Sequence, residues 1–357
     1  MKKTGWMAMA VMGVPLAAAA QSSVTLYGVL DAGVTFISNQ GGSRNTVMST
    51  GMQVPNLFGL QGSEDLGGGL KAIFKLEGQF GLENGQSIGG GAFGRQTYVG
   101  LASPWGTLTF GNQYEFMFES LSAKRLGQSL GYVSLYNLQQ GPFQGLGTPY
   151  GSLDFNRVAG AFRVANAVKY ETPDYRGLDA GVMYGFGGVA GSFGTDSTIS
   201  AGINYANGPL GLNAAYTYAK DPTINNGRDG IRNWGVGGRY TIGKLQLDAM
   251  YTNTRNTFSN AHVDVYQAGI DYMFSPFTIV HGDYQYMKGN AKLGNNKAHQ
   301  FGVTLDYWLS KRTDIYTNLV YQRASGNADA NAWISGLSAP AAGGNQTAVR
   351  IGMRHLF

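Results

Sequence analysis

The sequence contains no cysteine, which excludes disulfide bridges and leaves hydrogen bonding and buried area as the sources of stability. Charge is scarce too: Asp, Glu, Lys and Arg make up 13% of the 357 residues, against roughly 25% in ordinary soluble domains. Proline numbers only 10 and the glycines follow no three-residue repeat, so a collagen-like chain is excluded. An ordinary soluble enzyme rarely has this composition.

Long apolar runs are missing after residue 20, and a bundle of transmembrane helices needs runs of about 20 apolar residues. Basic residues are scattered along the chain, whereas a nucleic-acid partner calls for a basic face or stripe, so we expect no nucleic acid to bind. What the chain does have is glycine (55 residues) and aromatic side chains (12%). That much apolar area argues against disorder.

The first twenty residues form the only long apolar stretch. Lys2 and Lys3 are followed by an apolar core from Trp6 to Leu16 and by three alanines, Ala18 to Ala20. This pattern predicts a cleaved secretory signal peptide over residues 1–20 and a mature domain over residues 21–357. The alternative is a short buried helix at the N-terminus. Without the two lysines, the formal net charge falls from +5 to about +3.

Strict alternation of apolar and polar residues dominates the mature chain. In one such segment Leu245, Leu247, Ala249 and Tyr251 alternate with Gln246, Asp248, Met250 and Thr252. Period-two alternation predicts half-buried β-strands. The segments run for about 9 to 12 residues, which is the length that a tilted strand needs to cross a bilayer.

Seven short turns alternate with eight long polar loops, among them residues 38–53 and the longest, residues 115–162. Sixteen strands with short turns on one rim and long loops on the other are typical of an outer-membrane barrel. The fold predicted is therefore all-β, a 16-stranded antiparallel transmembrane β-barrel. A soluble β-sandwich or propeller is the alternative. The apolar parity of the last strand ends at Phe357, so we assign that aromatic C-terminus a role in barrel assembly.

Four stretches resemble a known family: residues 23–33 (SVTLYGVLDAG), 59–67 (GLQGSEDLG), 94–101 (GRQTYVGL) and the closing RHLF. They are similar to the 16-stranded, trimeric general porins of the Gram-negative outer membrane, in particular the betaproteobacterial group. The resemblance runs from Gln21 to the C-terminus. It implies a water-filled pore in a homotrimer embedded in outer-membrane lipid and lipopolysaccharide, with Gly28 and Ala32 on an outward face suited to close packing against a neighbour.

The resemblance also implies a pore narrowed by a third extracellular loop that folds into the lumen and carries acidic residues. Within residues 115–162 the acidic candidates are Glu115, Glu119 and Asp154. A loop of about 48 residues without regular structure is uncommon unless it is functional. Solvated side chains at the loop tip are the alternative for the two glutamates.

The pore wall is where the chain departs from the family pattern. Leu57, Gln61 and Asn112 stand where relatives commonly have basic residues. The remaining candidates for a basic wall are Lys75, Arg95, Arg163 and Lys169, and Asp31 and Glu77 are also expected to face the lumen. For each basic residue the alternative is a structural ion pair, for example with Glu77. The missing positive charges predict a pore that is weakly cation-selective or close to neutral.

Short glycine-rich strings mimic nucleotide-binding and hydrolase motifs, but strands follow them where those motifs require helices. The four histidines show no ligand spacing, so we expect no metal, no cofactor and no enzymatic activity. The function predicted is passive diffusion of ions and small hydrophilic solutes. A substrate-specific channel is the alternative, favoured by the apolar cluster of Phe116, Met117, Phe118 and Leu121 beside the glutamates; an enzyme on a barrel and an adhesive barrel are weaker alternatives.

Overall fold

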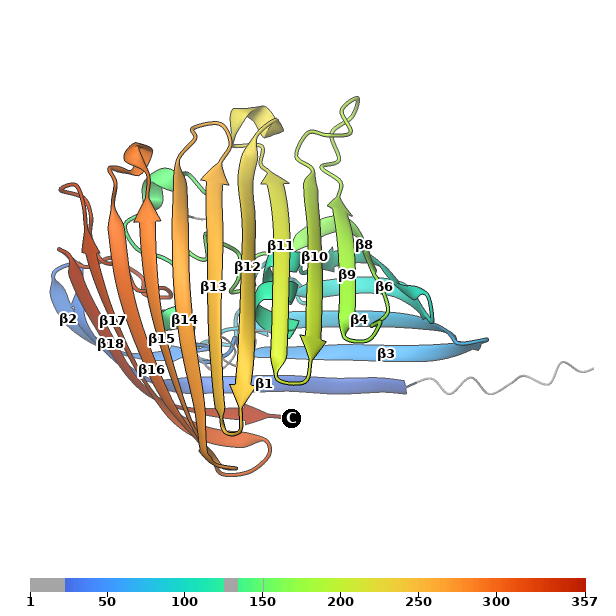
Figure 1. The fold of residues 1–357 in the computed structure, drawn as a ribbon, viewed down its shortest axis with the longest axis horizontal. Helices are drawn as coiled ribbons and strands as arrows, with labels where there is room; N and C mark the ends of the chain where they lie inside the picture. The colour runs from blue at the N-terminus through green and yellow to red at the C-terminus, as the bar shows by residue number, and fades with distance from the viewer. Residues whose placement is uncertain (1–22, 125–133, 150) are drawn as a thin grey trace, which may run out of the picture.

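The computed structural model describes residues 23–124, 134–149 and 151–357, so the predicted signal peptide lies outside the described residues. All the strands of the described residues belong to one antiparallel sheet (Figure 1). Its strands are β1 (Ser23–Gln40), β2 (Ser43–Thr50), β3 (Leu57–Gly67), β4 (Leu70–Phe80), β5 (Ser87–Ile88), β6 (Gln96–Ser103), β7 (Gly106–Gln113), β8 (Val164–Glu171), β9 (Leu178–Gly185), β10 (Thr198–Asn207), β11 (Leu210–Lys220), β12 (Gly230–Ile242), β13 (Leu245–Asn256), β14 (His262–Ser275), β15 (Thr278–Gly289), β16 (Lys297–Trp308), β17 (Thr313–Ser325) and β18 (Asn345–Leu356).

The sheet closes on itself as a barrel of sixteen strands. β2 and β3 pair with successive parts of β1, and β5 and β6 do the same along β4, so each of these two pairs is one interrupted barrel strand. β1 also pairs with β18, from Val29↔Leu356 to Ile37↔Ala348, which joins the two ends of the sheet. The predicted 16-stranded antiparallel barrel is confirmed, and closure leaves no exposed sheet edge.

The seven predicted short turns all join consecutive strands in the structure, and six of the eight predicted long loops lie between strands. The loop predicted at residues 82–94 contains the two-residue strand β5. The prediction was wrong for residues 38–53. Strand β1 instead runs on to Gln40, turns tightly at Gly41 and Gly42, and returns as β2. Both glycines have positive φ (61° and 98°), the backbone conformation that a tight hairpin requires.

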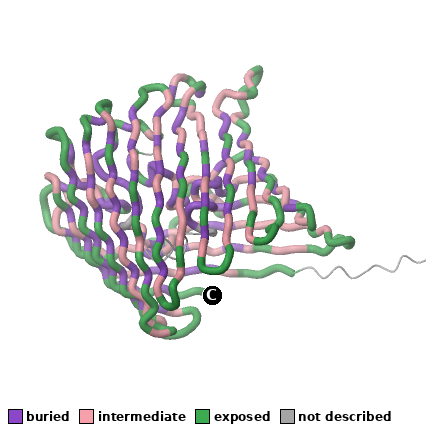
Figure 2. Tube along the Cα trace, viewed as in Figure 1, coloured by how far each residue is buried: buried purple, intermediate pink, exposed green. Residues whose placement is uncertain are grey.

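Alternation along the strands separates two faces (Figure 2). In β17 every second residue is buried, including Asp314, Asn318 and Gln322, while Ile315 and Leu319 between them are exposed. The buried face points into the barrel, because its polar side chains bond across the interior. The outer face is apolar, which is the reverse of a soluble barrel and suits a hydrocarbon environment. Among the described residues, no helix is long and apolar enough to cross a membrane.

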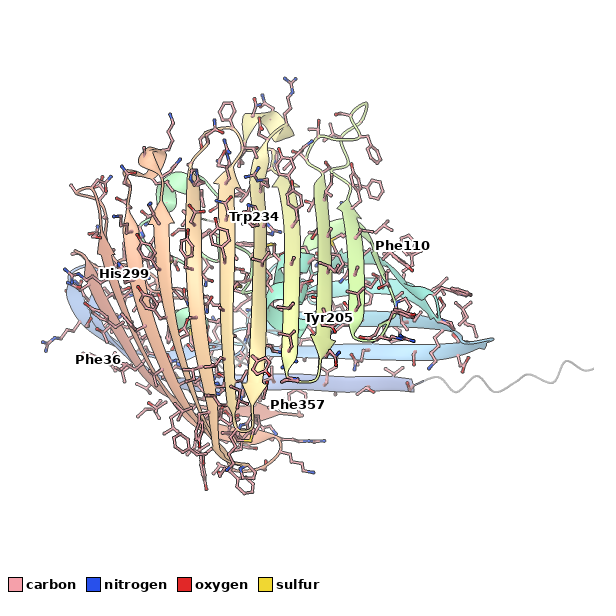
Figure 3. The ribbon with its side chains drawn as sticks, in the orientation of Figure 1. Phe36, Phe110, Tyr205, Trp234, His299 and Phe357 are labelled. Atoms are coloured by element: carbon pink, nitrogen blue, oxygen red, sulfur yellow. The ribbon has the colours of Figure 1, made fainter. Side chains whose placement is uncertain are left out.

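Aromatic side chains gather on the outer face near both rims, as in the girdles of membrane barrels. Figure 3 shows Trp234 toward the long-loop end of β12 and Tyr205 toward the short-turn end of β10. The rings near the long loops form a ladder of contacts: Trp234–Tyr251 (5.2 Å between ring centroids), Tyr251–Tyr266 (5.1 Å) and Tyr266–Tyr286 (6.2 Å).

The C-terminal residue Phe357 completes the closure. Its backbone exchanges two hydrogen bonds of 3.1 Å with Gly28 on β1. A Cβ atom at Gly28 would lie 2.3 Å from the Phe357 ring and 2.7 Å from the Leu57 carbonyl oxygen. The absence of a side chain at Gly28 therefore makes room for Phe357 of the same chain. Packing against a neighbouring subunit, which the sequence analysis expected, is not needed to explain the glycine.

Candidate functional site: the barrel interior

The described parts of the segment between β7 and β8, residues 114–124, 134–149 and 151–163, lie against the inner face of the barrel. The segment contains the single helical turn α1 (Phe116–Phe118), the π-helical turn η1 (Glu119–Lys124) and the 3₁₀ turns η2 (Leu135–Asn137) and η3 (Gln144–Leu146). Its hydrogen bonds reach inward-facing side chains on many strands: Ser200 of β10, Thr217 of β11, Asn233 of β12, Thr252 and Asn256 of β13, Gln267 of β14 and Gln300 of β16.

Apolar contacts fix the start of this segment to the wall. Phe116, Met117 and Leu121 are fully buried in one cluster with Val164 and Met183. The wall is shaped to receive them by glycines, since a Cβ at Gly181 would lie 2.2 Å from the Phe116 ring and one at Gly202 would lie 2.8 Å from it. These apolar side chains therefore anchor the segment and do not line an open path.

Glu115 is completely buried, with 0% of its side chain exposed. Its carboxylate accepts hydrogen bonds from the Met117 amide (2.7 Å) and the Thr217 hydroxyl (2.5 Å), and pairs with Arg157 at 3.4 Å. The interpretation of Glu115 as an acid lining the pore is wrong in this structure, because no water can reach the carboxylate. Its role is to cap α1 and tie it to β11.

Glu119 pairs with a residue of the predicted basic wall. Its carboxylate lies 2.5 Å from the Lys169 ammonium, and Glu171 lies 3.5 Å from the same group. Only 4% of the Lys169 side chain is exposed, against 16% for Glu119. The two candidates meet as an ion pair between loop and wall, so much of their charge is mutually compensated.

Asp154 closes a tight turn near the end of the segment. Its carboxylate accepts hydrogen bonds from the amides of Ala159 (2.8 Å) and Ala161 (2.9 Å). The side chain is fully buried, and this burial raises the pKa of Asp154 to about 7 despite the two hydrogen bonds. At neutral pH the residue is thus only partly charged.

Lys75, Glu77 and Arg95 form one network on the inner face. The Arg95 guanidinium donates to Glu77 (2.8 Å), Gln79 (2.8 Å) and the Tyr114 hydroxyl, and Lys75 lies 3.4 Å from Glu77. Lys75 and Arg95 therefore both form structural ion pairs with Glu77, which was the alternative interpretation of these basic residues. The network leaves one net positive charge on the wall.

Arg163 differs from the other three basic candidates, because among the described residues it forms no ion pair with a carboxylate. Its guanidinium donates to the carbonyl oxygens of Gly160 (3.1 Å), Ala161 (3.1 Å) and Gly94 (3.4 Å). It borders a cavity of about 920 Å³ between the long segment and β8–β12. The charged side chains lining that cavity are Asp154, Arg157, Arg163, Asp196, Lys220 and Asp221.

The three neutral positions on the wall lie in different surroundings. Gln61 is exposed on the inner parity of β3, opposite Lys75, and Leu57 shares that parity. Asn112 lies beside a register shift between β7 and β8, donates its amide to the carbonyls of Gly94 (3.1 Å) and Arg95 (3.3 Å), and lines the same cavity as Arg163.

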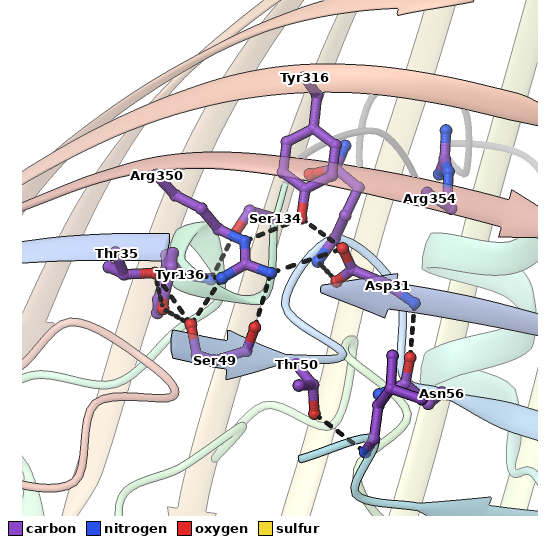
Figure 4. Close-up of polar contacts among 12 residues, drawn as sticks. Asp31, Thr35, Ser49, Thr50, Asn56, Ser134, Tyr136, Tyr316, Arg350 and Arg354 are labelled. Carbon is purple, nitrogen blue, oxygen red and sulfur yellow. Dashed lines mark hydrogen bonds and ion pairs between the residues drawn. The ribbon is translucent and has the colours of Figure 1, made fainter. Parts of the chain in front are cut away.

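Asp31 lies in a buried cluster that the sequence analysis did not foresee (Figure 4). It accepts from the Gln53 amide (2.7 Å) and the Tyr316 hydroxyl, and lies 3.5 Å from the guanidinium of Arg350. Arg350 has no exposed side-chain surface and also donates to Ser49 (2.6 Å). Parity could have found this residue, since Arg350 alternates with the outward Val349 and Ile351. The cluster joins β1, β2, β17 and β18 at the seam of the barrel.

In sequence and architecture the chain is similar to known outer-membrane porins. A family model described as Gram-negative porin matches residues 7–327. Outer membrane porin protein 32 of Delftia acidovorans is 31% identical, over 99% of this chain and 100% of that protein. An outer membrane porin protein of Bordetella pertussis is 29% identical, over 100% of both chains.

Solved structures agree. The anion-selective porin from Comamonas acidovorans superposes with a TM-score of 0.77 and 26% identity, covering 94% of this chain and 100% of that one. The trimer form of OmpT from Vibrio cholerae shares the fold alone, with a TM-score of 0.67 at 15% identity. With the closed barrel and its polar interior, these matches show that the chain belongs to the Gram-negative porins, the diffusion channels of the outer membrane.

Proposed function

We propose that this porin is a weakly selective channel whose width is set by the segment of residues 114–163. The observation that carries the proposal is the set of hydrogen bonds from this segment to inward-facing side chains of β10 to β14 and of β16. A segment held across the interior narrows the water-filled cross-section. Ions and small hydrophilic solutes then diffuse past it, and no cofactor or energy source takes part.

The charges along this path support a selectivity that is close to neutral. Around the cavity three carboxyl groups face three basic side chains. Glu119 and Lys169 compensate each other, and Lys75, Arg95 and Glu77 leave a single positive charge. Only charges within about 10 Å of a passing ion act on it at 0.1 M salt. We therefore propose weak selectivity. The positive charges that act most on a passing ion are Arg163, which forms no ion pair with a carboxylate among the described residues, and the single excess charge of the Lys75–Arg95–Glu77 network.

The alternative of a substrate-specific channel relied on the apolar cluster at Phe116, Met117, Phe118 and Leu121. Three of these side chains are buried against the wall, and the Phe118 ring contacts the Tyr114 ring in a tilted arrangement, with ring centroids 4.3 Å apart. None is presented to a passing solute as a guiding stripe. The diffusion channel is therefore favoured, and we propose no enzymatic activity.

We further propose that the chain is exported by the signal peptide of residues 1–20, which is then cleaved, and that the working form of the mature protein is a homotrimer. The trimer form of the OmpT neighbour supports the assembly, and the apolar outer face of the strands offers a surface for it. Crosslinking in mild detergent should yield a band at the mass of a trimer. If only monomer is found, the proposed assembly is wrong, while the channel proposal is unaffected.

Planar-bilayer recording tests the channel. We expect conductance to rise in proportion to KCl concentration without saturation, and sugar flux to show no stereoselectivity. Substituting Arg163→Gln should shift the reversal potential in a tenfold KCl gradient toward cations. Gln61→Glu is the control that adds charge on the same wall and should shift it in the same direction. Saturable, stereoselective flux would overturn the proposal in favour of a solute-specific channel.

A further inference from the structure

Five buried charged side chains meet where the last strands close on β1, and their charges do not balance. The carboxylates are Asp31 on β1, Asp306 on β16 and Asp314 on β17, each 0% exposed. The guanidinium groups are Arg350 and Arg354 on β18, which are 0% and 6% exposed. Figure 4 shows Arg354 beside the cluster of Asp31 and Arg350. Three carboxylates against two guanidinium groups leave one negative charge in excess.

Two of the three carboxylates are each matched by one guanidinium group. Asp31 lies 3.5 Å from the guanidinium of Arg350. Asp314 receives two hydrogen bonds from Arg354, because Nε donates to Oδ1 (2.9 Å) and Nη2 donates to Oδ2 (3.1 Å). This two-pronged arrangement is the strong form of an arginine–carboxylate pair. Asp31 and Asp314 are thus balanced, and Asp306 is the carboxylate in excess.

Asp306 relies on a donor that Asp314 already uses. Its Oδ2 accepts a hydrogen bond from the same Nη2 of Arg354 at 3.2 Å. Its other oxygen, Oδ1, is enclosed and accepts no hydrogen bond from the part of the chain that the structure describes. The carboxyl groups of Asp306 and Asp314 also lie within hydrogen-bond reach of each other. Two ionised carboxylates repel and have no proton to share, so this contact is a hydrogen bond only if one of them is protonated.

Neighbouring strands bring no further cation to Asp306 within the described part of the chain. On β17, Tyr316 lies directly opposite it, but the Tyr316 hydroxyl is bonded within the neighbouring ion pair. On β15 the opposite residue is Ile279, and the next inward residue, His281, is held by Asp271 at 2.7 Å. The shared guanidinium is therefore the cation on which Asp306 depends.

A proton fits this enclosed place better than a metal ion does. Among the described residues, no group of three or more His, Asp and Glu side chains is arranged to hold a metal ion. Trp308, the last residue of β16, lays its ring over the guanidinium of Arg354, with the ring centroid 5.0 Å from the guanidinium carbon. An unpaired carboxylate is so costly to bury that such a group takes up a proton instead.

We propose that Asp306 and Asp314 bind one proton between them when the barrel is folded at neutral pH. The proton comes from the solvent as the last strands close, forms the hydrogen bond between the two carboxyl groups, and returns to the solvent when the site opens. It reduces the net charge of the five enclosed side chains from −1 to zero. Because these carboxylates are enclosed, the site is independent of the selectivity proposed for the channel.

The bound proton makes closure of the barrel depend on pH. In the unfolded chain an aspartate releases its proton near pH 4, whereas the folded site keeps one at neutral pH. The stabilisation is therefore complete below pH 4 and is lost as the pH rises through the value at which the folded site deprotonates. Above that value two adjacent carboxylates share one guanidinium, and we expect the short-turn ends of β16, β17 and β18 to open more readily.

Infrared spectroscopy of the purified barrel detects the proton directly, because a protonated carboxyl group absorbs apart from an ionised one. At neutral pH the difference between the wild type and Asp306→Asn should show one protonated carboxyl group. Asp314→Asn leaves Arg354 balanced by Asp306 alone, so it should lose the same absorption, and it serves if the first variant does not fold. Asp329→Asn, at an exposed position of the last long loop, is the control and should keep it. Equal absorption in the wild type and both seam variants would overturn the proposal.

The rate of unfolding in concentrated urea measures the effect on closure. The wild type should unfold at least about tenfold faster at pH 9 than at pH 6, the change that one unit of proton linkage produces. Asp306→Asn should unfold at similar rates at both pH values, and Asp329→Asn should follow the wild type. A pH dependence that survives in Asp306→Asn would overturn the proposal and assign the effect to another group, such as His281. Protection by CaCl₂ that is present in the wild type and absent from Asp306→Asn would also overturn it, since a metal ion would then fill the site.

Discussion

Glu115 and Glu119 are four residues apart, yet burial gives them different roles. Glu115 is enclosed between α1 and β11, where its carboxylate is used entirely for internal hydrogen bonds. Glu119 keeps some exposure and compensates the charge of Lys169. In the sequence the two acids look equivalent, because both stand at the start of the long loop. Their surroundings in the folded chain distinguish them: Glu115 anchors the loop, whereas the charge of Glu119 influences passing ions.

Substituting Glu119→Gln should leave Lys169 with the more distant Glu171 alone, at 3.5 Å. We expect the reversal potential in a tenfold KCl gradient to move toward anions, because one negative charge disappears from the inner face. Glu115→Gln is the matched change at the buried position and should move it much less. Equal shifts from both variants would contradict the assignment of Glu115 to an enclosed anchor.

The second effect of Glu115→Gln should be on the stability of the segment. Glutamine retains one acceptor oxygen where the carboxylate has two, so either Arg157 or the Met117 amide loses its partner. An unpaired buried polar group costs about 1–3 kcal/mol. Hydrogen exchange at the Met117 amide should report local opening that is easier by that amount, and unchanged protection would argue against the capping role.

Asp154 makes the turn at residues 154–161 sensitive to pH. Burial raises its pKa to about 7, from about 3.9 in an unstructured chain. The folded turn therefore favours the protonated acid, so its stabilisation is complete below pH 4 and is lost as the pH rises through 7. After correction for intrinsic rates, exchange at the Ala159 and Ala161 amides should speed up between pH 5 and 8. Asp154→Asn should remove this pH dependence. If the exchange rates of this variant still depend on pH in the same way, another group is responsible.

Among the elements, the last long loop, residues 326–344, is tied to the inner face in the same way as the segment 114–163. Gln322 accepts a hydrogen bond from the Trp333 amide (2.6 Å), and Gln346 accepts one from the Ile334 amide (2.7 Å). Ile334 and Leu337 then pack with Tyr136 of the third long loop. Two loops distant in sequence are thus joined over one side of the barrel mouth.

Releasing the last loop should alter the channel. In the double variant Gln322→Ala and Gln346→Ala, Trp333 and Ile334 lose their acceptors and the loop can leave the interior. We expect single-channel records with higher mean conductance or more frequent flicker. Thr347→Ala, on the outward parity next to Gln346, is the control and should behave as the wild type. If the double variant has the conductance and the flicker frequency of the wild type, the loop does not lie in the ion path.

For the whole molecule, closure between β1 and β18 is the long-range event on which the barrel depends. The seam is held by the pairing of nine residues of β1 with β18, by the buried Arg350–Asp31 cluster and by Phe357 over Gly28. Substituting Gly28→Ala places a Cβ against both the Phe357 ring and the Leu57 backbone. Because the Leu57 backbone can move away only by disturbing its strand, we expect the substitution to destabilise the folded barrel.

We expect Gly28→Ala to lower the temperature at which the barrel loses its heat-modifiable mobility on gels. Crowding of this kind typically costs about 1–3 kcal/mol. Gly282→Ala is the matched control on the outer face of β15, where the nearest atom is a flexible Ile270 methyl group at 3.2 Å. If the two variants melt alike, the contact between Phe357 and Gly28 does not govern closure.

The sequence by itself determined the strand count, the turns and the two faces of the barrel. These features arise from local periodicity, because successive side chains of a strand point to opposite faces. Alternation around Leu247 and Asp248 already separates an outward from an inward residue. The barrel follows from such patterns, whereas the family was indicated by the resemblance of four short stretches, among them residues 23–33 and 59–67.

Tertiary structure alone decided which charges meet. Lys169 lies fifty residues from Glu119, and Arg350 lies more than three hundred residues from Asp31; periodicity says nothing about such pairs. It also decided that Glu115 is enclosed, that residues 38–53 form a hairpin and that Arg232 lies directly opposite Arg255 across β12 and β13. Closing the barrel sets the register of every strand and folds a long segment across the interior. The free energy of a charge depends on the neighbours and water that this closure leaves around it, and a linear sequence does not contain those distances.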